Sequence, residues 1–183
     1  MKPQIMLDLE FLGKIPTAAI ASIGAVEFDL TGIKREIYIP VDLRTSAERG
    51  GTLDADTVLW WLQQSAPARA AITDPNAIDI REALDNLTVW IPSDAEVWGN
   101  GSDCDNPILI NAYDGCSRPV PWDRIRGNRC YRTVKNMFPS VAKPLVNNDL
   151  HNALADAKWQ ALHLINIWTE FRDVLEELGR SQA

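Results

Sequence analysis

Three segments rich in apolar residues open the chain and predict β-strands over residues 4–11, 18–29 and 35–41. The first is apolar except for two acids at its centre, the second carries small and apolar residues, and the third alternates apolar with polar positions. Such alternation is typical of a strand with one buried face. Because the links between the segments are short, we expect an antiparallel meander.

The pattern then changes to the spacing of amphipathic helices. Residues 53–65 and 78–91 are expected to be helical, and Asp54 or Asp56 is a suitable cap for the first of these helices. The positions predicted to face inward are Val58, Trp61, Leu62 and Ser65 in the first helix and Ile80, Leu84 and Leu87 in the second.

The rest of the chain predicts a short strand over residues 95–100, a helix over 106–114 and a further strand near 121–130. Over residues 149–179, apolar side chains recur at spacings of four and three, which indicates a long helix that packs one face on a sheet. The end of this helix is also a candidate homodimer contact. The stripe consists of Leu150, Leu154, Ala157, Ala161, Leu164, Trp168, Phe171, Leu175 and Leu178.

This order of elements predicts a single α/β domain over residues 1–183, with a mixed central sheet flanked by helices. Hydrophobic residues make up 46% of the chain and charged residues 23%, which is usual for a globular protein. No apolar run approaches the length of a membrane span, and the acidic N-terminal segment does not resemble a signal peptide. We therefore expect a cytoplasmic protein without a membrane partner.

Charge and cysteine content exclude some classes of function. The formal net charge of −7 argues against bulk electrostatic binding of nucleic acid, although a local basic track or acids neutralised by a metal remain compatible with it. Cys104, Cys116 and Cys130 are odd in number and lack metal-ligand spacing, so neither a disulfide framework nor a zinc site is expected.

The two acids within the first strand are the chief anomaly of the pattern. Asp8 and Glu10 are two residues apart, so on a strand their side chains point to the same face and repel each other. Burying an unpaired carboxylate costs several kcal/mol. An edge strand with one wet face would explain the pair, and so would a bound cation.

Two later segments supply further candidate groups. Asp103 and Asp105 follow a predicted strand and a tight turn at Asn100, where sites gather in α/β sheets. His151 precedes Asp156 at the front of the long helix, and we expect His151 on the lead-in and Asp156 on the helix itself. From spacing alone, either Asp103 or Asp105 could belong to a site.

Taken in order, these segments resemble the three motifs of the DEDDh 3′–5′ exonucleases of the RNase H-like (DnaQ-like) superfamily. The motifs are Asp-x-Glu at Asp8 and Glu10, an Asn followed by Asp at Asn100 and Asp105, and His-x4-Asp at His151 and Asp156. The resemblance selects Asp105 over Asp103. The segments WWLQQSAPARAAI and GNGSDCDNPIL also resemble the small phage and bacterial exonucleases grouped with phage exonuclease A and a mycobacterial exoribonuclease.

The resemblance implies an RNase H-like fold and a metal-dependent exonuclease that releases nucleoside 5′-monophosphates from the 3′ ends of single-stranded DNA or RNA. It implies two divalent cations, Mg²⁺ or Mn²⁺, which prefer oxygen ligands and can act on both oxygens of an in-line displacement. The implied metal ligands are Asp8, Glu10, Asp105 and Asp156, with His151 as general base because histidine titrates near neutral pH. The implied substrate contacts are Phe11, Leu12, Asn100 and Arg132, with Phe11 standing where many relatives carry Thr.

A basic stretch between residues 118 and 143 offers either a phosphate-binding track, with Trp122 as a stacking surface, or a solvated face. It consists of Arg118, Arg124, Arg126, Arg129, Arg132, Lys135 and Lys143, opposed by Asp123. We interpret His163, beyond the third motif, as structural. Two other functions remain open, namely an RNase H-like endonuclease and a catalytically silent binding or interaction module on the same fold.

Overall fold

The computed structural model describes residues 2–145 and 151–181, with the side chains of the last helix described as far as Arg172. Five strands form one sheet in the order β3-β2-β1-β4-β5. The first three are antiparallel to one another, whereas β4 runs parallel to β1 and β5 parallel to β4. The mixed sheet and the antiparallel meander are therefore confirmed. The strands are β1 Gln4–Phe11, β2 Ile20–Asp29, β3 Gly32–Pro40, β4 Glu96–Gly99 and β5 Asn128–Cys130.

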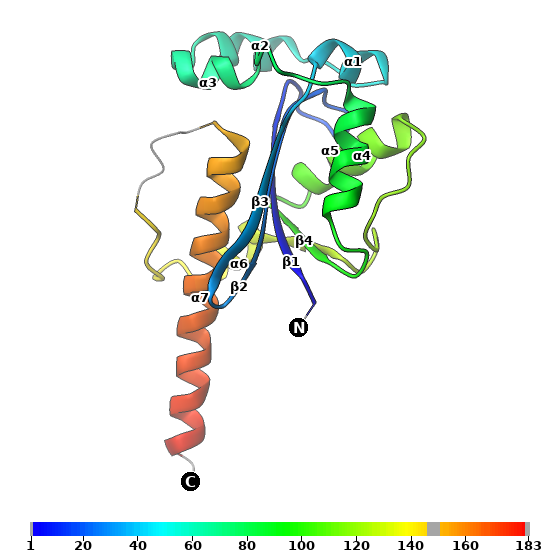
Figure 1. Cartoon of the computed structure of the whole chain (residues 1–183). Helices are drawn as coiled ribbons and strands as arrows, with labels where there is room; N and C mark the ends of the chain where they lie inside the picture. The colour runs from blue at the N-terminus through cyan, green and yellow to red at the C-terminus, as the bar shows by residue number, and fades with distance from the viewer. Residues whose placement is uncertain (1, 146–150, 182–183) are drawn as a thin grey trace.

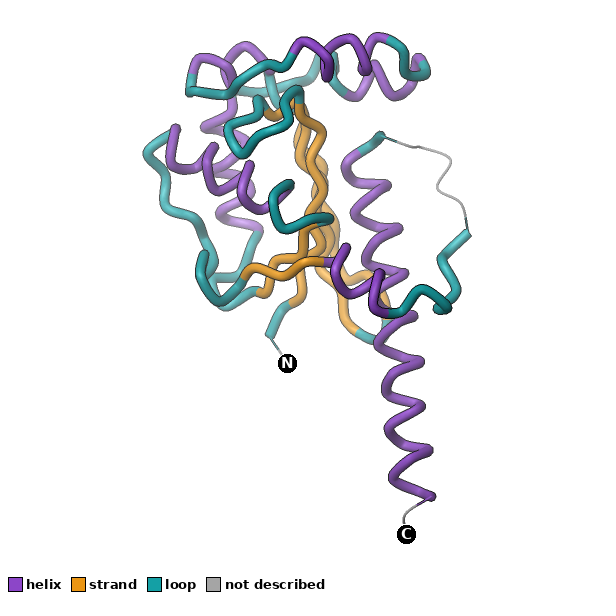
Figure 2. The backbone as a smooth tube through the Cα atoms, turned by 180° about the vertical axis from the view of Figure 1, so that it is seen from behind, coloured by secondary structure: helices purple, strands orange, loops and turns teal. Residues whose placement is uncertain are grey.

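Helices cover both faces of this sheet. Helix α7 lies along one face, while α4 and α5 lie against the other, and α1 to α3 cross one end of the strands (Figure 1). The view from behind shows the same three-layer arrangement, with α6 on the side of α7 (Figure 2). The helices are α1 Leu43–Glu48, α2 Ala55–Leu62, α3 Ala66–Ala71, α4 Ile80–Trp90, α5 Asp105–Gly115, α6 Tyr131–Met137 and α7 Ala153–Ser181.

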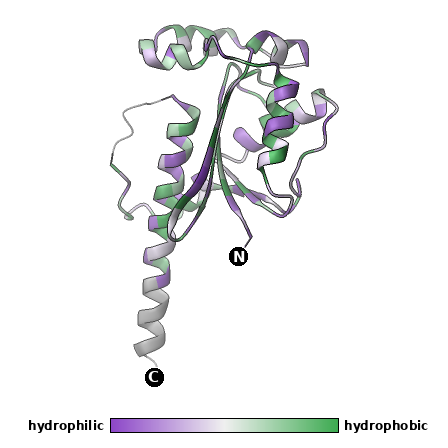
Figure 3. Cartoon of the chain, in the orientation of Figure 1, coloured by the Kyte–Doolittle hydropathy of each residue, from purple (hydrophilic) through white to green (hydrophobic). Residues whose placement is uncertain are grey.

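Strand β1 lies in the middle of the sheet, and both of its faces are buried because helices cover the sheet on both sides. Ile5, Leu7 and Leu9 point into the larger core, which the apolar faces of α4 and α5 complete. Met6 points the other way, into a second core beneath α7. Hydrophobic and hydrophilic residues alternate along α4 and α7, as expected for helices with one buried face (Figure 3). By the alternation of a strand, Asp8 and Glu10 share the face of Met6 and look toward α7.

The predicted helix over residues 53–65 is two helices. Asp54 caps α2, with its side chain accepting from the Thr57 N–H, so one of the two suggested caps is confirmed. Helix α2 ends at Leu62, and Ser65 caps α3 by accepting from the Ala68 N–H. The break leaves Leu62 and Ser65 exposed, so their predicted inward orientation is wrong.

The predicted inward face of the helix over residues 78–91 is confirmed in α4. Ile80, Leu84 and Leu87 are fully buried, as predicted for α4. The strand predicted near 121–130 is the short β5, whereas α1 and α6 are too short to produce a periodic pattern in the sequence. In the predicted stripe, Leu150 lies outside the described residues, as do the side chains of Leu175 and Leu178. Among the described helices, none is long and apolar enough to cross a membrane.

The start of α7 packs directly on the backbone of β2 at Gly24. A Cβ atom at this position would lie 2.2 Å from both the Ala153 carbonyl carbon and the Leu154 nitrogen. Ala153, Ala157 and Ala161 are completely buried, which shows that a face of small side chains meets the sheet. Because Gly24 pairs with Asp8 across β1 and β2, this close approach sets how near α7 comes to the acids.

We predict that Gly24→Ala lowers the free energy of unfolding by more than about 3 kcal/mol, because the methyl group meets backbone atoms that move only with the whole helix. Gly50→Ala is the matched control, since a Cβ there meets nothing within 4 Å and only the positive φ of 96° is unfavourable. That strain costs about 1–2 kcal/mol. Urea unfolding of both variants is the measurement, and equal losses would contradict the packing argument.

Candidate active site

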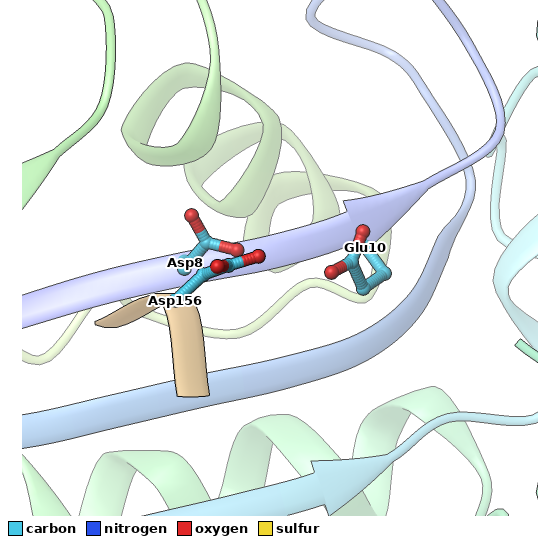
Figure 4. A group of neighbouring side chains, drawn as sticks. All are labelled: Asp8, Glu10 and Asp156. Carbon is cyan, nitrogen blue, oxygen red and sulfur yellow. The ribbon is translucent and has the colours of Figure 1, made fainter. Parts of the chain in front are cut away.

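Three carboxylates gather where the first turn of α7 meets the middle of β1. One oxygen each from Asp8, Glu10 and Asp156 lies within 4.8 Å of the others. Asp8 and Glu10 project from β1, and Asp156 reaches Asp8 from the start of α7 (Figure 4). Glu10 is 7% exposed, and its Oε1 is buried without a hydrogen-bond partner among the described residues. The edge strand with a wet face is thus ruled out as the explanation for the acid pair.

Asp105 approaches the same place from α5, the helix that follows the parallel strand β4. Its Oδ1 accepts from the Leu9 N–H at 3.2 Å and its Oδ2 from the Asn100 N–H at 2.6 Å. The side chain is 3% exposed. A Cβ at Gly99 would lie 3.1 Å from the Asp105 Cβ, so the absence of a side chain there lets α5 begin against the strand end. Asp103, the rejected alternative, is exposed.

Burial raises the pKa values of the acids, and in Asp8 and Glu10 the charges of the neighbouring acids add to the effect. Burial raises the pKa of Glu10 to about 8, with the charges of Asp156 and Asp105 adding to the effect. Burial also raises the pKa of Asp8 well above its usual value, to which Asp105, Glu10 and Asp156 contribute further, while the Gln160 hydrogen bond opposes the shift. The pKa of Asp105 rises to about 6 through burial, against the effect of its backbone hydrogen bonds. A cluster of this kind favours either protons or a cation.

His151 lies on the lead-in to α7, as expected, and adopts a left-handed backbone conformation with φ of 64°. Its N–H donates to Asp156 Oδ2 at 3.2 Å, and Asn152 then caps the helix through the Ala155 N–H. The imidazole stands edge-on to two indoles, with ring centroids 5.0 Å from Trp60 and 5.9 Å from Trp61. The aromatic contacts and the turn together hold the ring beside the carboxylates.

A cleft of about 410 Å³ joins these groups. Its lining includes the predicted residues Asp8, Glu10, Phe11, Asn100, Asp105, Arg132, His151 and Asp156. Leu12 is different, because its side chain is 5% exposed, packs with Ala21 and Trp61 in a small core, and does not line the cleft.

Sequence reasoning missed several cleft residues. Gln160 donates from Nε2 to Asp8 Oδ1 at 2.7 Å, and its position four residues after Asp156 on a helix was an available signal. Trp60 and Trp61 line the cleft from α2, and the Trp61 indole N–H donates to the Phe11 carbonyl at 3.1 Å. Nothing in the pattern of α2 indicated that its tryptophans would meet His151.

The basic stretch does not form one track. Arg118, Arg124 and Arg129 form ion pairs with Asp85, Asp114 and Glu96 at 2.8, 3.0 and 2.6 Å respectively. Trp122 is 4% exposed, and its indole N–H donates to the Asn128 side chain at 2.8 Å, so its predicted role as a stacking surface is wrong. His163 is buried, with Nδ1 2.7 Å from the Tyr131 hydroxyl, which agrees with a structural role.

Comparison with known proteins identifies the family. Residues 3–168 match the family described as "3′-5′ exoribonuclease Rv2179c-like domain". The chain belongs to this family. Comparison with curated proteins gives no match.

Solved structures of two exonucleases have the same fold as this chain. E. coli Exonuclease I in complex with a dT13 oligonucleotide is similar with a TM-score of 0.66 and 12% identity, over 97% of this chain and 43% of that chain. The chain thus spans less than half the length of that protein. The nuclease domain of 3′hExo, described as a DEDDh family member bound to rAMP, gives a TM-score of 0.57 and 12% identity over 92% of both chains. The predicted RNase H-like fold is confirmed.

Membership of the exoribonuclease family implies a divalent metal, and the residues present fit one. The donors are carboxylate oxygens, which Mg²⁺ and Mn²⁺ prefer, and the buried Glu10 Oε1 lacks a hydrogen-bond donor among the described residues. Asp8, Glu10 and Asp156 would hold the metal, with Asp105 beside them. Arg132 is the one cationic side chain among the residues that line the cleft, so the protein itself offers little neutralising charge.

We predict that the metal-free protein becomes less stable as the pH rises from about 5 to 8. The folded-state pKa of Glu10 is about 8 and that of Asp8 is also raised. In this window the folded state therefore binds more protons than the unfolded state, and the free energy of unfolding falls with rising pH. Urea unfolding in EDTA measures the fall, and adding Mg²⁺ or Mn²⁺ at pH 8 should reverse it.

Two variants test the origin of this dependence. Asp8→Asn removes one of the repelling charges and should flatten the pH dependence, whereas Asp103→Asn removes an exposed acid outside the cluster and should leave it unchanged. A free energy of unfolding that rises between pH 5 and 8 in EDTA would disprove the electrostatic account.

Proposed function

We propose that the protein is a divalent-metal-dependent 3′–5′ exonuclease that hydrolyses phosphodiester bonds of single-stranded nucleic acid and releases nucleoside 5′-monophosphates. The observation that carries the proposal is the convergence of Asp8, Glu10 and Asp156 within 4.8 Å, with Asp105 and His151 in the same cleft. The description of the family as exoribonucleases makes RNA the first substrate to test.

In this proposal the residues of the chain have distinct roles. Asp105, fixed by two backbone N–H groups, and Asp8, fixed by Gln160, present carboxylates in defined orientations. His151 accepts the proton of the attacking water, as a general base must lie beside the reacting groups and its ring lies in the same cleft as the carboxylates. Divalent metal, when bound, supplies positive charge that stabilises the developing charge on the phosphodiester oxygens.

The finer features are also proposals. Four acids carry the charge of two divalent ions, so we propose two ions, Mg²⁺ or Mn²⁺, held by Asp8, Glu10, Asp105 and Asp156. Phe11, Asn100 and Arg132 line the cleft and are suited to contact the terminal nucleotide. We keep a cytoplasmic location, a homodimer and the absence of a membrane partner as predictions.

We expect 5′-labelled RNA and DNA oligonucleotides to be shortened from the 3′ end with Mg²⁺ or Mn²⁺ and to remain intact in EDTA. Asp105→Asn should lower the rate at least about 10²-fold, because the change weakens a ligand in a buried cluster. Asp103→Asn, which alters an exposed acid two residues away, is the control and should keep most activity. Cleavage of circular substrates would instead indicate an endonuclease, and intact substrates under all conditions would indicate a silent binding module.

We predict that His151→Ala slows single-turnover cleavage by about 10²–10⁴-fold, the usual contribution of a general base. Calorimetric titration with Mn²⁺ should give nearly unchanged binding, because the side chain is not among the proposed ligands. Asp156→Ala is the contrasting variant and should weaken both cleavage and Mn²⁺ binding.

The contact between Trp60 and His151 provides a further test of His151 as the general base. Trp60 is 43% exposed and touches His151 edge-on, so Trp60→Ala should slow cleavage in the wild-type background. In the His151→Ala background it should have little further effect, since interacting residues are not additive. If the His151→Ala variant cleaved at the wild-type rate, His151 would not be the general base.

A further inference from the structure

Two hollows lie along α6 beyond the cleft, and the second of them is lined by two lysines in addition to the Arg132 that the cleft shares with the first hollow. The first, of about 260 Å³, shares Arg132 and Cys104 with the cleft and extends to Asn136. The second, also of about 260 Å³, shares Asn136 with the first and is lined by Lys135 and Lys143. Shared lining residues thus place the first hollow between the cleft and the second hollow along α6.

The cations on this path differ from the other basic residues of the same stretch. Arg132, Lys135 and Lys143 form no ion pair within the described parts of the chain, whereas Arg118, Arg124 and Arg129 are each paired. Burial and the charges of Arg132 and Lys143 lower the pKa of Lys135. The three positive charges therefore act on one another, and an anion among them would relieve the repulsion. Asp103 is the one acid that lines either hollow, and it is exposed.

The second hollow also has aromatic walls. Phe138 and Trp159 line it together with the two lysines. Cations beside aromatic rings are the combination with which proteins hold single strands, since phosphates pair with the charges and bases stack on the rings. On the other side of the cleft, at the start of α2, Lys14 is already bound by Asp54 and Asp56 at 3.1 and 2.7 Å. The α6 side is thus the favourable exit for a polyanion.

We infer that the hollow lined by Lys135, Lys143, Phe138 and Trp159 is a second nucleotide-binding site, which holds the backbone of the substrate strand upstream of the cleaved 3′ end. The inference rests on the proposed exonuclease function. The strand runs from the cleft past Arg132 and along α6 to this hollow. The site adds affinity for strands long enough to reach it and does not take part in the chemistry.

The test compares a Lys135→Ala/Lys143→Ala double variant with an Arg124→Ala/Arg126→Ala double variant, which loses the same charge from the same basic stretch but away from the hollows. Single-turnover cleavage is measured on RNA strands of about 3 and 12 nucleotides, lengths chosen to fall short of and to span a single-strand site of about 4–16 nucleotides. For the lysine variant, the enzyme concentration that gives the half-maximal cleavage rate should rise about tenfold on the longer strand only. Maximal rates should stay unchanged on both strands.

Equilibrium binding of the longer strand in EDTA, followed by fluorescence anisotropy, provides a readout that needs no turnover. The slope of log affinity against log salt should become shallower by about 1.4 in the lysine variant, since each phosphate contact on a single strand contributes about 0.7. The arginine control should keep the wild-type slope. The inference would be overturned if the lysine variant and the wild type had equal salt slopes. It would also be overturned if the concentration for half-maximal rate rose equally on the short and the long strand.

Failure of the proposed function gives a different result. A wild-type protein that binds the longer strand in EDTA but cleaves no strand with metal would refute the exonuclease and leave the binding site to be judged by the salt slopes. A wild-type protein that neither binds nor cleaves would overturn both.

Discussion

The contact between the start of α7 and the backbone of β2 at Gly24 is the constraint on which the rest of the structure depends. No side chain separates the two elements there, and the fully buried Ala153, Ala157 and Ala161 continue the close approach along the helix. Gly24 lies opposite Asp8 in the sheet. The packing that seals one face of the sheet therefore also brings Asp156 and Gln160 to the acids of β1, so fold and site share one interface.

The acid cluster opposes this packing. Strand β1 crosses the middle of the sheet, and its Ile5, Leu7 and Met6 contribute to both cores. The same strand buries Asp8 and Glu10, and burial together with the charges of the neighbouring acids raises the pKa values of both side chains. The apolar layers on either side supply the stability that allows such a cluster to persist. A site of this kind is typical of function rather than of folding, because buried like charges weaken the folded state.

Most of the basic residues between 118 and 143 fall into two groups, those that form ion pairs within the fold and those that line the cleft and the hollows. Three arginines of the stretch between residues 118 and 143 neutralise acids on α4, α5 and β4 and so act in the structure. Arg132, Lys135 and Lys143 lie instead at the cleft and the hollows beyond it. An acidic protein can in this way present a local positive path to a polyanion, although its net charge of −7 argues against bulk attraction.

Much of the fold was readable from the sequence because it rests on local patterns. The strands of the meander, the inward face of α4 and the cap at Asp54 follow from periodicity and capping chemistry, which involve only neighbouring residues. The acids Asp8 and Glu10 stood out because carboxylates within an apolar strand need a partner. Asp105 and His151 were selected by the resemblance to the DEDDh exonuclease motifs, and the structure places both in the cleft.

Tertiary structure decided what neighbours in the sequence cannot. Leu62 and Ser65 fit an apolar helical face, yet they are exposed because the chain starts a second helix at that point. Trp122 was suited to stacking on a base, but the loop before β5 buries it against Asn128. The contact of Trp60 with His151 and the sorting of the basic stretch into paired and unpaired cations depend on elements far apart in the chain. Periodicity reports which face of an element is buried, whereas only packing in three dimensions determines what that face meets.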